Sequence, residues 1–268
     1  MVTIERGSGE PLVFIPGLQG RWEYMQPAVD ALSQSRRVIT FPLCDEPVAR
    51  AAFQRQKGFD SYAAQVAAVL DAAQIERAAI CGISFGGLIA LRFAATMPGR
   101  TSALVLASTP GPRFHLKARH KLYARVPWLF GPLFAAESPS RLRAEVKAAL
   151  PDETERRQFM RKQMHTFRRA PLSVSRMAAR ALLIESYDRT ADCASVACPT
   201  LVVHGEPSLD FVVDANETAS YGRLIPGAHV VMLERTGHLG SITQPRRFAD
   251  IVSSFLDAAR KDNQHSAA

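Results

Sequence analysis

The sequence lacks the long hydrophobic runs that a membrane span requires. Its longest uninterrupted apolar runs hold a handful of residues, such as Ala103 to Ala107, whereas a helix that crosses a bilayer needs about 20. The first residues bring an acid at Glu5, and no hydrophobic region or cleavage site of a signal peptide follows. We therefore expect a soluble, cytoplasmic protein with no membrane partner.

Cysteine is scarce, and its spacing excludes the common metal sites. The four cysteines, Cys44, Cys81, Cys193 and Cys198, form no CxxC pair and have no histidine at zinc-ligand spacing. We expect reduced thiols, no metal and no cofactor. The composition, 47% hydrophobic and 22% charged over 268 residues, is that of an ordinary folded protein and excludes a disordered chain.

Positive charge is concentrated in one segment. Residues 113–190 contain 17 Lys and Arg against 7 Asp and Glu, a net charge of +10, whereas the whole chain carries +8. A basic segment attracts anionic substrates, membranes or nucleic acid, or it is simply a solvated helical face. No recognition module for nucleic acid is visible, so we expect no nucleic-acid partner.

Strand-like and helix-like segments alternate outside this basic segment. Continuous apolar runs, which are typical of strands buried on both faces of a parallel sheet, occur at 12–15, 38–41, 78–81, 103–107, 200–204 and 229–233. Helical spacing of apolar residues occurs at 61–74, at 85–97 and from Pro245 to about Arg260, with a frayed tail from Lys261. The pattern predicts an α/β fold with a mostly parallel central sheet flanked by helices.

The basic segment has helical patterns and no strand-like run. We therefore predict a core formed by residues 1–112 and 191–268, interrupted by an all-helical cap over 113–190.

The run at 78–81 leads into Gly82-Ile83-Ser84-Phe85-Gly86, which is followed by a helix. A serine at a sharp strand-to-helix turn has strained backbone geometry and an exposed hydroxyl above the sheet edge. Glycines two positions before and after it are needed, because side chains there would collide with the neighbouring strand and helix. The alternative is a glycine-rich turn with an incidental serine. The strand before it and the helix after it favour a nucleophile.

A serine hydroxyl needs a base to remove its proton and a third group to orient that base. Of the seven histidines, only His238 lies in a glycine-flanked loop at a sheet edge, within Thr236-Gly237-His238-Leu239-Gly240. His204 and His229 fall at strand ends, where a structural role is expected. The others, His115, His120, His165 and His265, lie in the basic segment or the tail.

The third group of such a site is an acid, and the loop after 200–204 offers two. We favour Asp210, because Phe211-Val212-Val213 would anchor its turn against the core, whereas Glu206 sits close to the strand end. Both carboxylates stay open as candidates.

Ser84, Asp210 and His238, in that chain order and with this turn, resemble the α/β-hydrolase superfamily, over nearly the whole chain. The resemblance implies that Ser84 is the nucleophile, His238 the base and Asp210 its orienting acid. It also implies that the backbone N–H groups of Leu18 and Phe85 form the oxyanion hole.

The sequence departs from the family pattern at two places. Pro16 replaces a histidine that usually precedes the oxyanion loop, which is tolerable because the donor is a backbone group of Leu18. The family's acid commonly stands where Ser208 stands, two residues before Asp210, so the turn must be longer here.

The cap carries apolar residues that either pack on the core or line a substrate pocket. They are Leu116, Leu122, Val126, Trp128, Leu129, Phe130, Leu133 and Phe134. The arginine pairs of 156–169 recur too evenly around a helix to form one stripe, so most must face solvent.

The function that the sequence favours is hydrolysis of a carboxylic ester or lactone, or of another acyl or C–C bond. The substrate is a small molecule, and an anionic one if the basic segment attracts it. The alternative is a catalytically weak ligand-binding protein with the same fold. A serine at position 84 argues against dehalogenase and epoxide hydrolase chemistry, which runs through a carboxylate. The sequence makes no prediction of the oligomeric state.

Overall fold

The computed structural model describes residues 1–266, without the side chains of 132–139 and 262–266. Its centre is a seven-stranded sheet in the order β1-β3-β2-β4-β5-β6-β7. The strands are β1 (Ile4–Arg6), β2 (Pro11–Ile15), β3 (Arg37–Thr40), β4 (Ala78–Ile83), β5 (Thr101–Ala107), β6 (Thr200–His204) and β7 (His229–Met232). All neighbouring strands are parallel except β1, which is antiparallel to β3.

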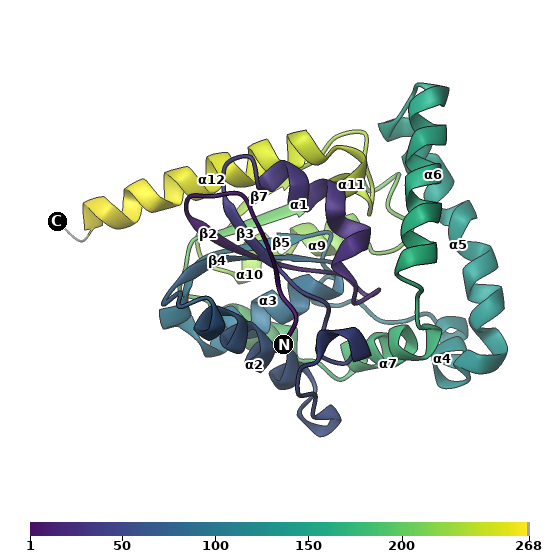
Figure 1. The fold of residues 1–268 in the computed structure, drawn as a ribbon, viewed down its shortest axis with the longest axis horizontal. Coiled ribbons are helices and arrows are strands. Elements are labelled where there is room, and N and C mark those ends of the chain that lie inside the picture. The colour runs from purple at the N-terminus through teal and green to yellow at the C-terminus, as the bar shows by residue number, and fades with distance from the viewer. Residues whose placement is uncertain (267–268) are drawn as a thin grey trace.

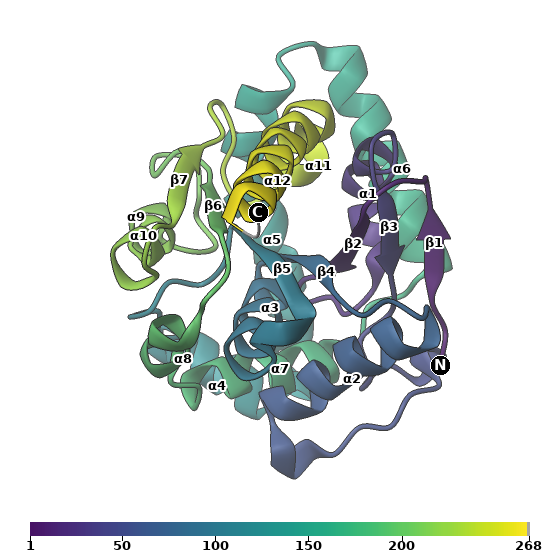
Figure 2. The ribbon, with the colours of Figure 1, turned by 90° about the vertical axis from the view of Figure 1, so that its left-hand side faces the viewer.

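Helices cover both faces of the sheet (Figures 1 and 2). One face packs on α1 (Gln26–Leu32), α11 (Gly240–Thr243) and α12 (Pro245–Ser266). The other packs on α2 (Phe59–Ala72), α3 (Phe85–Thr96), α8 (Arg189–Ser195) and α10 (Tyr221–Leu224). The short helix α9 (Ala215–Ala219) and the 3₁₀ turns η1 (Trp22–Met25), η2 (Pro47–Ala49), η3 (Arg55–Lys57) and η4 (Pro98–Arg100) lie in connections.

The central strands are apolar throughout because they are buried on both faces. Every residue of β4 is buried. Ile80 packs into the core on the side of α2 and α3, and its neighbours Ala79 and Cys81 pack into the core on the side of α1 and α12. Successive side chains of a strand point to opposite faces, so a continuous apolar run fills both cores. The predicted α/β fold is confirmed.

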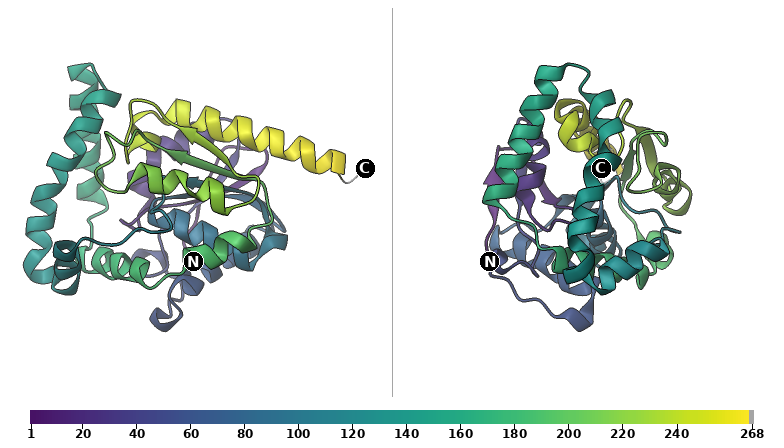
Figure 3. Two further views of the ribbon diagram at one scale, coloured as in Figure 1. Left: turned by 180° about the vertical axis from the view of Figure 1, so that it is seen from behind. Right: turned by 90° about the vertical axis from the view of Figure 1, so that its right-hand side faces the viewer.

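Four helices lie between β5 and α8. They are α4 (Ala118–Arg125), α5 (Pro127–Ala149), α6 (Glu153–Arg169) and α7 (Val174–Glu185). Figures 1 and 3 show α5 and α6 at the end of the molecule opposite the C-terminus. The division into a core and a cap over 113–190 stays a prediction, and we use the term cap for α4 to α7.

Two cap helices begin with a side chain that accepts a backbone hydrogen bond, and most of their basic side chains are exposed. Asp152 accepts from the N–H of Glu155 at the start of α6, and Ser173 does the same for Arg176 in α7. Among the arginine pairs and lysine of 156–169, Arg156 is partly buried and the others are exposed. They therefore face solvent, as predicted. Of the predicted apolar cap residues, Leu133 and Phe134 lie outside the described side chains, and Trp128 is 79% exposed.

Several element boundaries differ from the sequence prediction. α12 continues as helix to Ser266, so no fray begins at Lys261. α2 begins at Phe59, with Gly58 at its N-cap, two residues before the predicted start at 61. Helix α1 was not predicted, because it has only seven residues and a proline at its start.

The four cysteines are buried and free. In the part of the chain that the structure describes, no helix is both long and apolar enough to cross a bilayer.

Candidate active site

Ser84 lies at a strained turn between β4 and α3. Its backbone has φ of 54° and ψ of −119°, a left-handed conformation that costs a non-glycine residue about 1–3 kcal/mol. Hydrogen bonds on both sides hold it there. The Ser84 N–H donates to the Ala107 carbonyl at 2.8 Å, and its own carbonyl accepts from the Gly87 N–H at 2.9 Å. The turn places the partly exposed serine at the C-terminal edge of the sheet.

The glycines around Ser84 are required by close backbone approaches. A Cβ at Gly82 would lie 2.1 Å from the Gly86 carbonyl oxygen, and a Cβ at Gly86 would lie 2.4 Å from the Ile15 carbonyl oxygen. The collisions predicted for these two positions are therefore real, and they are with backbone atoms that cannot give way.

His238 reaches Ser84 from the loop between β7 and α11. Its Nε2 atom is 3.1 Å from Ser84 Oγ, a distance at which the hydroxyl donates to an unprotonated Nε2. The loop is held by Thr236, whose hydroxyl donates to the Leu233 carbonyl at 2.6 Å. It also packs against the loop after β6, because a Cβ at Gly237 would lie 2.4 Å from the Leu209 carbonyl oxygen.

Asp210 lies behind His238 on the side away from Ser84. Its Oδ2 atom is 3.5 Å from His238 Nδ1, and the Asp210 side chain is 1% exposed. Oδ1 accepts from the N–H groups of Val212 and Val213, both at 2.9 Å. Neither Oδ2 nor Nδ1 has another hydrogen-bond partner among the described residues. The 3.5 Å separation is longer than an ordinary hydrogen bond, but catalytic hydrogen bonds are often long before substrate binds. Asp210 Oδ2 and His238 Nδ1 are therefore placed to interact.

The expectation that Phe211, Val212 and Val213 all anchor the turn of Asp210 against the core was partly wrong. Phe211 is 58% exposed and Val212 is 42% exposed, so of the three apolar residues only Val213 anchors the turn. The two hydrogen bonds to Asp210 Oδ1 fix the turn instead. Glu206 Oε1 accepts from the Arg235 N–H at 2.6 Å and thus binds the backbone three residues before His238.

The electrostatic surroundings of His238 favour its charged form. Burial lowers the pKa of the imidazole, but the charges of Asp210 and Glu145 outweigh it, and the pKa is raised above 6.5. The imidazolium that forms when His238 accepts a proton is therefore stabilised by two carboxylates.

Leu18 and Phe85 lie on either side of Ser84. Phe85 is the first residue of α3, where the N–H groups of a helix have no partner within it. Leu18 belongs to the loop after β2. The adjacent Gly17 lies beside the turn at Ser84, since a Cβ added at Gly17 would be 3.5 Å from Ser84 Cβ. Among the described residues, neither N–H donates a hydrogen bond. Both N–H groups are therefore available to bind an oxyanion.

Arg180 of α7 fixes the Leu18 loop, and the sequence analysis missed it. It is 1% exposed, and its guanidinium donates to the Leu18 carbonyl at 2.8 Å. The same group forms a bidentate pair with Asp45, at 2.9 and 2.7 Å, and binds Glu46 at 2.6 Å. One buried arginine in a segment rich in exposed arginines has no distinguishing sequence signal.

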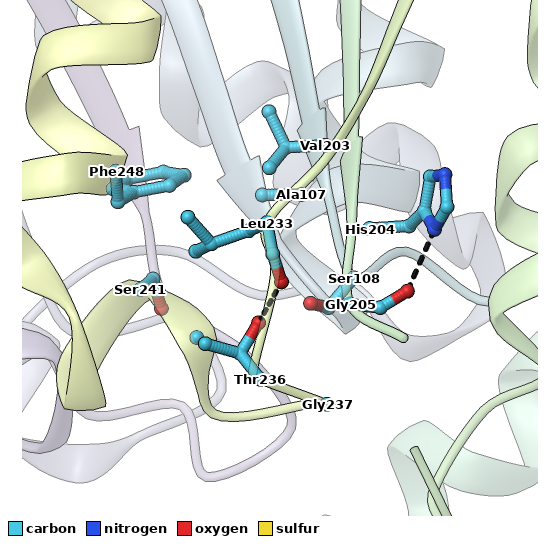
Figure 4. A pocket seen from close by; sticks show the side chains of 11 residues that line it. Ala107, Ser108, Val203, His204, Gly205, Leu233, Thr236, Gly237, Ser241 and Phe248 are labelled. Carbon is cyan, nitrogen blue, oxygen red and sulfur yellow. Dashed lines mark hydrogen bonds between the residues drawn. The ribbon is translucent and has the colours of Figure 1, made fainter. Parts of the chain in front are cut away.

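A small cavity of about 10 Å³ lies beneath the His238 loop (Figure 4). Its walls include Ser108, Thr236 and Phe248. It is too small for an organic substrate, so it belongs to the packing of the loop. His204 borders it and has Nδ1 2.7 Å from the Gly205 carbonyl oxygen, which agrees with a structural role. Within the described residues, no group of three or more His, Cys, Asp or Glu is arranged to hold a metal ion.

Comparison with known families agrees with this architecture. The model of the alpha/beta hydrolase family matches residues 12–251. The chain belongs to the alpha/beta hydrolase family. Among curated relatives, this hydrolase is 26% identical to 2-hydroxy-6-oxo-2,4-heptadienoate hydrolase of Pseudomonas putida, over 94% of this chain and 91% of the relative. It is 27% identical to 2-hydroxymuconate semialdehyde hydrolase of a Pseudomonas species, over 95% and 89%.

Solved structures show the same fold. The enol-lactonase from Burkholderia xenovorans superimposes on this alpha/beta hydrolase with a TM-score of 0.72 and 21% identity, over 96% of each chain. An esterase from Exiguobacterium antarcticum gives a TM-score of 0.75 and 18% identity, over 95% of this chain and 94% of the esterase.

The buried Arg180 network gives a prediction about stability. Arg180→Met leaves the Asp45 carboxylate without its partner and Glu46 with Arg176 alone, so we expect the free energy of unfolding to fall by about 3–5 kcal/mol. Urea denaturation measures it. The matched control, Arg161→Met on the exposed surface of α6, changes stability by about 0.5 kcal/mol or less. Equal losses in the two variants would show that the network contributes nothing particular.

Proposed function

We propose that this alpha/beta hydrolase cleaves a carboxylic ester or lactone through an acyl-enzyme on Ser84. The proposal is supported most directly by the 3.1 Å approach of His238 Nε2 to Ser84 Oγ. The strained turn at Ser84 and the nearly buried Asp210 behind the imidazole add to it.

The first half of the reaction forms the acyl-enzyme. Ser84 Oγ attacks the carbonyl carbon of the substrate while its proton passes to His238 Nε2. The Asp210 carboxylate stabilises the resulting imidazolium, and the N–H groups of Leu18 and Phe85 bind the negative oxygen of the tetrahedral intermediate. The intermediate then expels the alkoxide, which takes the proton from His238. An ester releases a separate alcohol at this point, whereas the new hydroxyl of a lactone stays attached to the acyl group.

The second half regenerates the serine. His238 removes a proton from a water molecule, and the hydroxide attacks the acyl carbon. A second tetrahedral intermediate forms at the same two N–H groups. It collapses to release a carboxylic acid, and Ser84 Oγ recovers its proton from His238. No cofactor or metal enters this scheme.

A second candidate is hydrolysis of a C–C bond next to a carbonyl group. Two relatives at 26% and 27% identity carry the names of a dienoate hydrolase and a semialdehyde hydrolase.

The expected substrate in either case is a small molecule. The net charge of +10 on residues 113–190 favours an anionic substrate, because opposite charges attract a substrate to the site. A slow or inactive ligand-binding protein is the remaining alternative.

The nucleophile is tested by Ser84→Ala. We expect ester or lactone hydrolysis to fall by a factor of about 10⁴ to 10⁶, because the serine, its base and its acid act as one unit. Initial rates on a panel of p-nitrophenyl esters, lactones and dienoic diketones, varied in chain length and charge, measure this and rank the substrate classes. Ser195→Ala, on the exposed end of α8, is the control and retains the wild-type rate. A Ser84→Ala enzyme as active as this control would contradict the mechanism.

The choice of acid is tested by comparing Asp210→Asn with Glu206→Gln. Each substitution removes one negative charge with little change in shape. We expect Asp210→Asn to lower kcat by a factor of about 10³ to 10⁴, because Asp210 faces His238 Nδ1. Glu206→Gln, which keeps an oxygen for the Arg235 N–H, should cost less than about tenfold. The reverse order in steady-state kinetics would assign the acid to Glu206.

A further inference from the structure

Glu145 is a buried acid of the cap that contacts the loop carrying His238. It lies in the last two turns of α5 and is 1% exposed. Its Oε1 atom accepts from the N–H of Leu239 at 2.5 Å. Leu239 directly follows His238, so a side chain from the cap holds the backbone beside the catalytic base.

A second contact joins the same two segments. The Arg235 guanidinium donates to the Ala148 carbonyl from Nε at 3.3 Å and from Nη2 at 3.1 Å. Residues 145–148 of α5 thus bind the loop at both ends, on either side of His238. Because α5 belongs to the cap and Asp210 to the loop after β6, the imidazole is oriented by two separate parts of the fold.

The charges around His238 support a functional reason for this contact. Glu145 Oε2 is buried and has no hydrogen-bond partner among the described residues, as is also true of Asp210 Oδ2. Burial raises the pKa of Glu145 to about 7, although the Gly237 amide, the charge of His238 and the Leu239 amide act in the opposite direction. The Glu145 charge in turn raises the pKa of His238.

We propose that Glu145 is a positioning residue for His238, which holds the catalytic loop and adds its carboxylate to that of Asp210 in stabilising the imidazolium. The inference rests on the proposed function, in which His238 is the base. It makes the cap part of the catalytic machinery. Any movement of α5 away from the core withdraws one of the two carboxylates and makes His238 a weaker base.

The neighbouring charged groups define what a pH experiment reports. Asp210 and Glu206 approach from the loop after β6, Arg235 lies in the His238 loop, and α11 carries no charged side chain. Glu145, with its pKa of about 7, and His238 are coupled, so their titration follows the pair rather than either group alone.

The variant that isolates the charge is Glu145→Gln, since the amide oxygen still accepts from the Leu239 N–H. Loss of the negative charge destabilises the imidazolium, so we expect the acidic limb of the kcat/KM profile to move to lower pH. The NMR titration of the His238 imidazole should move in the same direction. Glu145→Ala removes the hydrogen bond as well and should lower kcat about tenfold to a hundredfold, with a smaller change in KM.

The matched control is Glu155→Gln, the same chemical change at an exposed site on α6, which leaves the profile and the His238 titration unchanged. The NMR titration needs no activity, so it separates this inference from the proposed function. An active Ser84→Ala enzyme would contradict the function. If Ser84→Ala is inactive and His238 titrates in Glu145→Gln as it does in the wild type, only the role of Glu145 is contradicted.

The wild-type protein provides a test that does not depend on a folded variant. Because Glu145 and His238 interact, the imidazole signals of wild-type His238 should shift in two steps as pH changes, rather than one. A single step would overturn the proposal even if the Glu145 variants failed to fold.

Discussion

The approach of Ser84 Oγ to His238 Nε2 depends on the parallel sheet. Parallel strands bring their C-terminal ends to one edge, so the turn after β4 meets the loops after β6 and β7 there, although Ser84 precedes Asp210 and His238 by more than 100 residues in the chain. The short distance also requires backbones without side chains at Gly82, Gly86 and Gly237. The sheet brings the loops together, and the glycines let them approach closely enough for a hydrogen bond between the Ser84 and His238 side chains.

The cap contributes two buried charges to this edge. Arg180 of α7 holds the loop of Leu18, and Glu145 of α5 holds the loop of His238. A buried charge is costly unless it is paired. Arg180 is fully paired with Asp45 and Glu46, and so it mainly stabilises the structure. Glu145 has one oxygen, Oε2, without a hydrogen-bond partner among the described residues. This is expected of a carboxylate whose charge stabilises a neighbouring imidazolium instead of a fixed ion pair.

The sequence was sufficient to predict the core strands of the fold and the position of the turn at Ser84. Continuous apolar runs as short as 78–81 and 103–107 indicate strands buried on both faces, because a helix would need a longer run. The Gly-x-Ser-x-Gly turn between strand and helix is similarly specific. Short elements such as α1 were missed, because seven residues hold too few turns to establish a period.

Side-chain pairing across the cap and core was not predictable. Arg180 and Glu145 differ from their exposed neighbours only in burial, which the order of residues does not encode locally. The acid beside His238 was harder to assign for the same reason. Two carboxylates follow β6, and the one that faces the imidazole is selected by a turn whose hydrogen bonds to Asp210 Oδ1 come from its own backbone.

Covalent labelling with a fluorophosphonate, followed by mass spectrometry of the intact protein and its peptides, tests whether Ser84 is an activated nucleophile. An activated serine attacks the phosphorus of such a reagent and displaces fluoride, and the phosphonyl group stays bound to Oγ. We predict one adduct per folded chain, on the peptide that contains Ser84, and slow labelling when His238 is replaced by alanine. A folded protein that stays unlabelled, or that carries the adduct on another residue, would contradict it.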